Sequence, residues 1–106
     1  MSSVRDALQR FRAGFAAVDA DVRWHFSGVL TYATAGSVLE DSASLRLPSS
    51  GEVDLGDAEA VDSAAVAVLV ALKRRALAEG KSVRFTNAPA AIPVLADLYG
   101  VEDILA

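Results

Sequence analysis

Residues 52–80, EVDLGDAEAVDSAAVAVLVALKRRALAEG, hold the clearest pattern of the sequence and decide its fold class. Residues 52–55 alternate between acidic and apolar side chains, which predicts a short strand that Gly56 and Asp57 bring to an end. An apolar run follows and predicts a helix from about residue 63 to 79, with Gly80 as its C-cap. The stretch therefore predicts a strand that leads into a long helix.

The N-terminal segment has two interpretations. Apolar residues recur every three or four positions between residues 4 and 18, which would suit one amphipathic helix. Alternatively, residues 15–18 and 22–27 form two short strands around an Asp-rich turn at residues 19–21. The clean alternation of residues 22–27 favours the hairpin, with a leader segment over residues 1–14 before it.

The other segments continue an alternation of helices and strands. The sequence predicts a helix that begins at Thr31 or Thr34 and ends near residue 44, with Val38 and Leu39 as apolar anchors. Further along the chain it predicts a strand over residues 82–86, a helix over residues 91–99, and a short turn or helix over residues 101–105. Strands separated by helices imply partly parallel pairing, because parallel neighbours need a crossover connection. We therefore expect one small α/β domain with a mixed sheet over residues 15–106.

The composition excludes several classes of function. The chain has 106 residues, with 14 acidic and 10 basic side chains and a formal net charge of −4. This charge argues against binding of nucleic acid or an anionic membrane through a general electrostatic field. The absence of Cys and the single His exclude thiolate catalysis, Cys-ligated metals and most His-ligated metal sites. No segment approaches the roughly 18 apolar residues of a membrane span, so we expect a cytoplasmic protein without a metal or cofactor.

Three groups of polar side chains could carry chemistry. His25 lies on the polar face of its predicted strand without a second His or a nucleophile motif, so we interpret it as an exposed strand residue. The spacing of Asp54, Asp57 and Asp62 matches no cation-binding loop, and Asp62 has a simpler role as a helix cap. Ser63 stands at the predicted start of the long helix, where backbone amides and the helix dipole favour negative charge. Ser63 is therefore either a further cap residue or the site of a charge switch such as phosphorylation.

The predicted long helix has apolar side chains on two sides. At 100° per residue, one side holds Val66, Leu69, Val70, Lys73, Ala76 and Leu77, and the opposite side holds Ala67, Val68, Ala71, Arg75 and Ala78. The first two turns of the second side carry small apolar residues where a solvated helix normally carries charge. This side is therefore a candidate protein-binding surface, with the basic run at residues 73–75 at its rim.

The strand and the helix together resemble the core of the STAS domain family (sulfate transporter and anti-sigma-factor antagonist). Residues 53–57, VDLGD, and residues 61–69, VDSAAVAVL, carry the resemblance, in which a strand with an Asp leads to an Asp-Ser pair that opens a helix. The Gly80 helix end, the strand at residues 83–85 and the segment LYGV at residues 98–101 extend it to nearly the whole chain.

The resemblance implies a small single STAS-like domain, with a mixed sheet and helices packed mainly on one side. The fuller family signature has a second hydroxyl residue and a Gly where this chain has Ala64 and Ala65. The Cβ atoms of these residues would then occupy a surface that a Gly leaves open for close approach.

Two branches of the family imply different partners. The segment LYGV at residues 98–101 and the single-domain length are more similar to the MlaB-like branch. This branch implies a non-enzymatic cytoplasmic subunit that binds and supports the ATPase of a phospholipid-transporting ABC transporter at the inner membrane, which maintains outer-membrane lipid asymmetry. In the anti-sigma-factor antagonists, the Ser that matches Ser63 is phosphorylated by a partner serine kinase. In both branches the resemblance implies a partner-binding surface made of Asp62, Ser63, Ala64, Ala67, Val68 and Ala71.

Overall fold

The computed structural model describes residues 13–105, so the predicted leader lies outside the described residues except for Ala13 and Gly14. The strands are β1 (Gly14–Val18), β2 (Arg23–Leu30), β3 (Glu52–Val61) and β4 (Arg84–Thr86). The helices are α2 (Ala35–Ser42), α3 (Ser63–Ala78), α4 (Ala91–Leu98) and α5 (Glu102–Leu105). These elements follow one another in the order that the sequence predicts.

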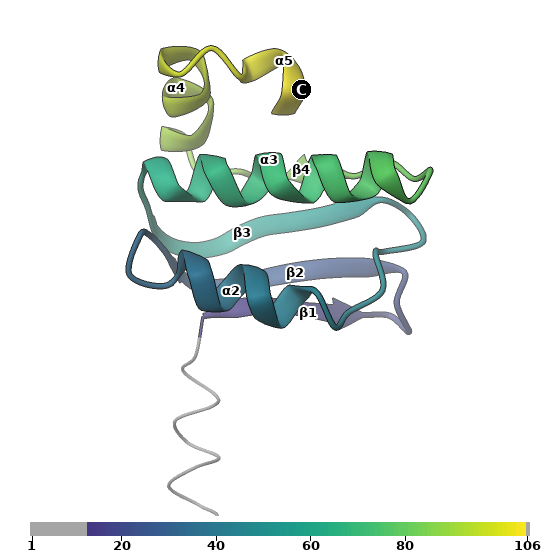
Figure 1. The fold of residues 1–106 in the computed structure, drawn as a ribbon. Coiled ribbons are helices and arrows are strands. Elements are labelled where there is room, and N and C mark those ends of the chain that lie inside the picture. The colour runs from purple at the N-terminus through teal and green to yellow at the C-terminus, as the bar shows by residue number, and fades with distance from the viewer. Residues whose placement is uncertain (1–12, 106) are drawn as a thin grey trace, which may run out of the picture.

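The strands form one mixed sheet with the spatial order β1-β2-β3-β4. β1 and β2 are antiparallel, whereas the pairs β2–β3 and β3–β4 are parallel. Helices α2 and α3 supply the crossover connections that parallel neighbours require. Figure 1 shows α3 running alongside β3 and α2 lying across β1 and β2. The predicted α/β architecture with a mixed sheet is confirmed.

The predicted hairpin of β1 and β2 is confirmed, and its turn has an unusual backbone. Asp19, Ala20 and Asp21 have positive φ angles of 52°, 53° and 69°. This left-handed region is uncommon for residues other than Gly, although Asp adopts it more readily than most. The guanidinium of Arg23 donates to Asp19 Oδ2 from Nη2 at 2.7 Å and from Nε at 3.1 Å, which ties the turn to the second strand.

β3 is longer than the strand predicted over residues 52–55. It continues through Gly56 and Asp57 to Val61, so the prediction that these two residues end the strand is wrong. The pairing with β2 shifts register twice, and at each shift β3 contributes one residue more than β2. Such bulges break the alternation of side chains, which is why the sequence pattern stops before the strand does.

α2 begins close to its predicted position but is anchored differently. Thr34 occupies the N-cap position, yet its hydroxyl donates to the Val29 carbonyl at 2.8 Å and makes no cap hydrogen bond. The helix buries the face that carries Val38 and Ser42. Leu39 is 37% exposed because consecutive residues of a helix point about 100° apart, so its predicted role as an apolar anchor is wrong.

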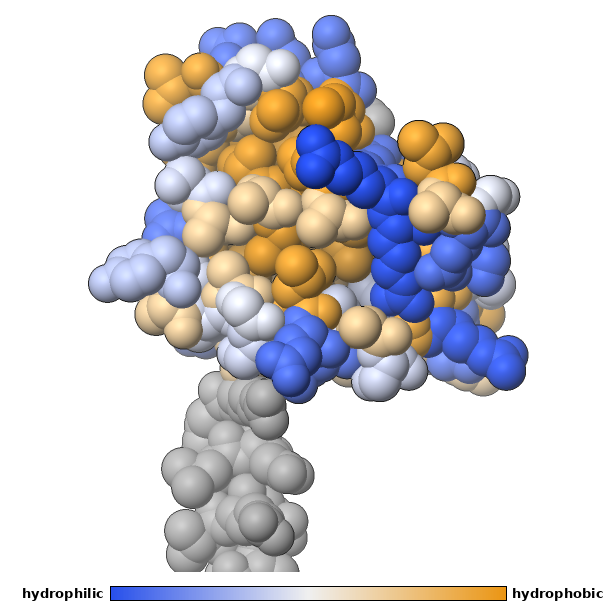
Figure 2. All heavy atoms as spheres, in the orientation of Figure 1, coloured by the Kyte–Doolittle hydropathy of each residue, from blue (hydrophilic) through white to orange (hydrophobic). Residues whose placement is uncertain are grey.

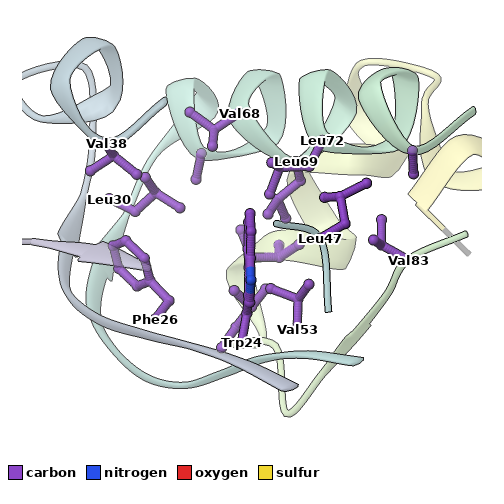
Figure 3. Close-up of a cluster of buried hydrophobic side chains, with 14 residues drawn as sticks. Trp24, Phe26, Leu30, Val38, Leu47, Val53, Val68, Leu69, Leu72 and Val83 are labelled. Atoms are coloured by element: carbon purple, nitrogen blue, oxygen red, sulfur yellow. The ribbon is translucent and has the colours of Figure 1, made fainter. Parts of the chain in front are cut away.

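Trp24 lies at the centre of the core between the sheet and α3 (Figure 3). Its indole is fully buried, and Nε1–H donates to the Arg46 carbonyl at 2.9 Å, which satisfies its only polar atom. The ring of Phe15 packs against it with centroids 5.4 Å apart. The other buried members of this cluster come from strands, helices and loops: Phe26, Leu30, Val38, Leu47, Val53, Leu55, Ala65, Val68, Leu69, Leu72, Ala76, Val83 and Ile92.

The rotation of α3 is set by the stripe that it buries in this core. The stripe consists of Ala65, Val68, Leu69, Leu72 and Ala76, whose spacings of one, three and four residues place them on one face of the helix. The sequence pattern grouped Leu69 with Leu77, but Leu77 is 80% exposed. Eight positions rotate a helix by about 80°, and this angle takes Leu77 out of the core.

We expect Leu69→Ala to lower the free energy of unfolding by about 2–5 kcal/mol, because it deletes fully buried methyl groups and leaves a cavity. Leu77→Ala is the matched control on the same helix, and its exposed position predicts a change within about 0.5 kcal/mol. Urea denaturation followed by Trp24 fluorescence measures both changes. Equal losses for the two variants would contradict the rotation of α3 described above.

Candidate functional site

The start of α3 is held by the carboxylate of Asp62, which occupies the N-cap position with an extended backbone. Its Oδ1 accepts a hydrogen bond from the Ala64 amide at 2.8 Å and thus caps the helix as predicted. Its Oδ2 accepts one from the Tyr32 amide at 3.1 Å. The same carboxylate therefore joins the first turn of α3 to the loop between β2 and α2.

Ser63 is the first residue of α3 and is exposed. Its hydroxyl makes no hydrogen bond to residues 13–105. The Oγ atom is therefore available to a partner or to a modifying enzyme. It stands at the positive end of a helix 16 residues long. Added negative charge is favoured at this position, as the charge-switch interpretation requires. The amide of Ala64, however, already donates to the Asp62 carboxylate.

An open groove runs along α3 beside the connection from α4 to α5. Its volume is about 540 Å³, and most of its lining is apolar. The lining residues are Ser63, Val66, Ala67, Val70, Ala71, Arg74, Tyr99 and Val101, which we call the α3 groove. Figure 2 shows apolar and weakly apolar side chains gathered over α3 and between α3 and the C-terminal helices. An exposed apolar concavity of this kind is typical of a protein-binding surface.

Three of the six predicted surface residues line this groove, whereas Asp62, Ala64 and Val68 do not. Ser63, Ala67 and Ala71 are groove residues, as the candidate surface requires. Val68 is only 3% exposed and belongs to the core cluster, so its placement on the surface is wrong. Residues 64–72 of the helix are apolar on all sides, and the hydrophobic pattern alone could not show which stripe faces the sheet.

The basic run at residues 73–75 does not form the predicted rim as a unit. Lys73 Nζ donates to the Val83 carbonyl at 2.6 Å and lies 5.5 Å from the centre of the Phe85 ring. Arg75 donates to the carbonyls of Ser42 and Leu45 and thereby holds the loop that follows α2. Only Arg74 of this run lines the α3 groove.

The two alanines that depart from the fuller family signature have different surroundings. Ala65 is fully buried in the core, so its Cβ faces the sheet and not the groove. Ala64 is half-buried, and its amide is the one that Asp62 caps. The expectation that both Cβ atoms occupy the close-approach surface is therefore wrong for Ala65.

Several groove residues were not predicted from the sequence. Val66 and Val70 were assigned to the opposite side of the helix from Ala67, and Tyr99 was noted only as part of a C-terminal pattern. Tyr32, which is 84% exposed beside the Asp62 cap, was not singled out at all. A large aromatic side chain in a polar turn was the available signal for this last residue.

The acidic residues considered as a cation site do not come together. Asp54 accepts hydrogen bonds from the Gly56 amide and the Asn87 side chain, and these hold its pKa below the usual value. Asp57 lies with Oδ2 at 2.9 Å from His25 Nε2, and Asp62 caps α3. Within residues 13–105, the structure contains no cluster of three or more His, Cys, Asp or Glu side chains suited to a metal ion.

The family comparison agrees with this geometry. The family described as "Mlab, STAS domain" matches residues 13–106, which is nearly the whole chain. The chain belongs to the STAS domain family. Its similarity is to the MlaB-like form of that domain, and STAS domains are in general binding or accessory domains and not enzymes. No curated protein matches the chain. Among the described residues of this STAS domain, no helix has the length and apolarity that crossing a bilayer requires.

We expect Asp62→Ala to lower the free energy of unfolding of the STAS domain by about 1–2 kcal/mol, because it removes the helix cap and the link to the Tyr32 amide. Asp62→Asn keeps one acceptor oxygen and should lose less. Thermal denaturation measures the stability, and hydrogen exchange at the amides of Tyr32 and Ala64 locates the effect. Exchange rates equal to those of the wild type in Asp62→Ala would contradict the proposed double contact.

A second prediction concerns the acid stability of the domain. Because hydrogen bonds lower the pKa of folded Asp54, its contribution to stability is present above the pKa of the unfolded state. This contribution is lost as the pH falls through the pKa of the folded carboxyl. Asp54→Ala should therefore flatten the acid limb of a plot of unfolding free energy against pH, measured by urea denaturation. Glu59→Ala, in the same strand, is the control, and identical slopes for both variants would contradict the prediction.

Proposed function

We propose that this STAS domain is a non-enzymatic subunit that binds the ATPase of a phospholipid-transporting ABC transporter through the α3 groove. In this role the protein works on the cytoplasmic side of the inner membrane and supports an ATPase that maintains outer-membrane lipid asymmetry. The family match to the MlaB-like form supports this choice of partner.

The observation that carries the proposal is the α3 groove itself. Small or branched apolar side chains line it, and Ser63 stands at the end where α3 begins. Alanine and valine lose little conformational freedom when a partner covers them, which favours association. Because Arg74 is the only ionic group in the lining, the surface is suited to binding and not to acid–base chemistry.

A second candidate function is a phosphorylation-switched antagonist of an anti-sigma serine kinase. The free and exposed hydroxyl of Ser63 is the observation that favours it. A phosphoryl group at this position would add about −1.5 to −2 charge next to the carboxylate of Asp62. Repulsion between the two would weaken the cap and change the binding surface, which is what a switch requires.

Purification of the tagged protein from its native host distinguishes the two candidates. Recovery of an ABC ATPase together with its permease, with Ser63 unmodified by mass spectrometry, supports the transporter subunit. Recovery of a serine kinase, with phosphate on Ser63, supports the antagonist and contradicts the transporter proposal.

We expect Ser63→Glu to weaken binding to the ATPase at least about tenfold, because it places an unpaired charge in an apolar interface. Titration calorimetry with the purified ATPase measures the affinity. Ser63→Ala removes only the hydroxyl and should bind nearly as well as the wild type. Ser82→Glu adds the same charge in the loop at the other end of α3 and serves as the matched control. Unchanged affinity in Ser63→Glu would contradict docking at this groove.

A further inference from the structure

The exposed face of α3 is too small to hold a partner alone. A helix of 16 residues is about 24 Å long and about 10–12 Å wide, so one exposed face offers roughly 250–300 Å². A specific protein–protein interface of standard size buries about 800 Å² on each partner. A partner that docks on the α3 groove must therefore also cover elements beside it.

The loop between β2 and α2 is one such neighbour, and it presents Tyr32. The side chain of Tyr32 is 84% exposed, the largest exposed fraction among the big apolar residues of the described chain. Its amide is held at 3.1 Å by Asp62, directly before the groove residue Ser63. Figure 1 shows this loop at the same end of the molecule as the start of α3. The hydrogen bond therefore fixes the backbone of an exposed aromatic residue against the residue that precedes Ser63, at the start of α3.

Arg74 lines the groove further along α3, in the C-terminal half of the helix. It is the only ionic residue in the lining. Its side chain makes no ion pair or hydrogen bond to residues 13–105. Its neighbours in sequence, by contrast, use their charges within the fold. A guanidinium without an acidic partner suits a carboxylate on a binding protein, since Arg binds carboxylates with two parallel hydrogen bonds.

We propose that the partner covers Tyr32 together with the α3 groove and places an acidic side chain on Arg74. Ser63, which follows the residue that binds the Tyr32 amide, and Arg74 are eleven residues apart on one helix, a rise of about 17 Å along its axis. The partner surface thus combines a pocket for an aromatic ring near the start of α3 with a carboxylate that reaches Arg74 further along the helix. Exposed aromatic and Arg side chains are the residue types that most often dominate binding energy. The inference rests on the proposed function, because it concerns the same docking surface.

The test measures the Kd of the full chain for the purified ATPase subunit by titration calorimetry. We expect Tyr32→Ala to raise the Kd about 30-fold, as the loss of a dominant contact would. Arg74→Gln should raise the Kd and also reduce its dependence on salt concentration, because an interfacial ion pair is lost. Val22→Ala and Lys81→Gln make matched changes at exposed positions of the opposite end of the domain, and these should bind within about twofold of the wild type. Circular dichroism confirms that each variant is folded.

The outcomes separate this inference from the proposed function. Weaker binding for Tyr32→Ala and Arg74→Gln, with both controls unchanged, supports the inference. If Ser63→Glu abolishes binding while Tyr32→Ala and Arg74→Gln bind like the wild type, the inference is overturned and the docking groove stands. If Ser63→Glu also binds normally, or if the ATPase does not bind the wild type, the proposed function itself is overturned.

Discussion

Burial of one stripe of α3 against Trp24 and its neighbours determines where the other side chains of that helix lie. Because Ala65, Leu69 and Leu72 must face the sheet, Ala67 and Ala71 on the other side of the helix face the groove. The residues that line the groove are therefore determined by how α3 packs on the core. It also follows that α3 cannot rotate to change the candidate binding surface, since rotation would expose its core stripe to water.

Polar contacts tie α3 to neighbouring segments of the chain. Asp62 uses both carboxylate oxygens, one for the first turn of α3 and one for the loop that carries Tyr32. Elsewhere on α3, Arg75 donates to the carbonyls of Ser42, the last residue of α2, and of Leu45 in the loop that follows. These contacts join segments that lie about 30 residues apart in the sequence, and the Asp62 contacts order the start of the candidate binding surface in the unbound protein.

The three consecutive basic residues 73–75 of α3 have different contacts. Lys73 and Arg75 satisfy carbonyl groups inside the fold, and Arg74 between them points to the groove. Consecutive residues on a helix are about 100° apart, so neighbours of one basic run reach three different surroundings. For a STAS domain with a net negative charge, this leaves one cation on the candidate binding face.

The sequence alone determined the order of elements, the mixed sheet and the capped start of α3 at Asp62, because these depend on the alternation of helices and strands and on capping chemistry. Tertiary structure decided the length of β3, since bulges hide a strand from its pattern. It also decided that Val68 is buried, because a helix that is apolar on all sides has no preferred face until a sheet covers it. The placement of Tyr32 beside Asp62 likewise required the fold, since a hydrogen bond across 30 residues leaves no trace in local sequence.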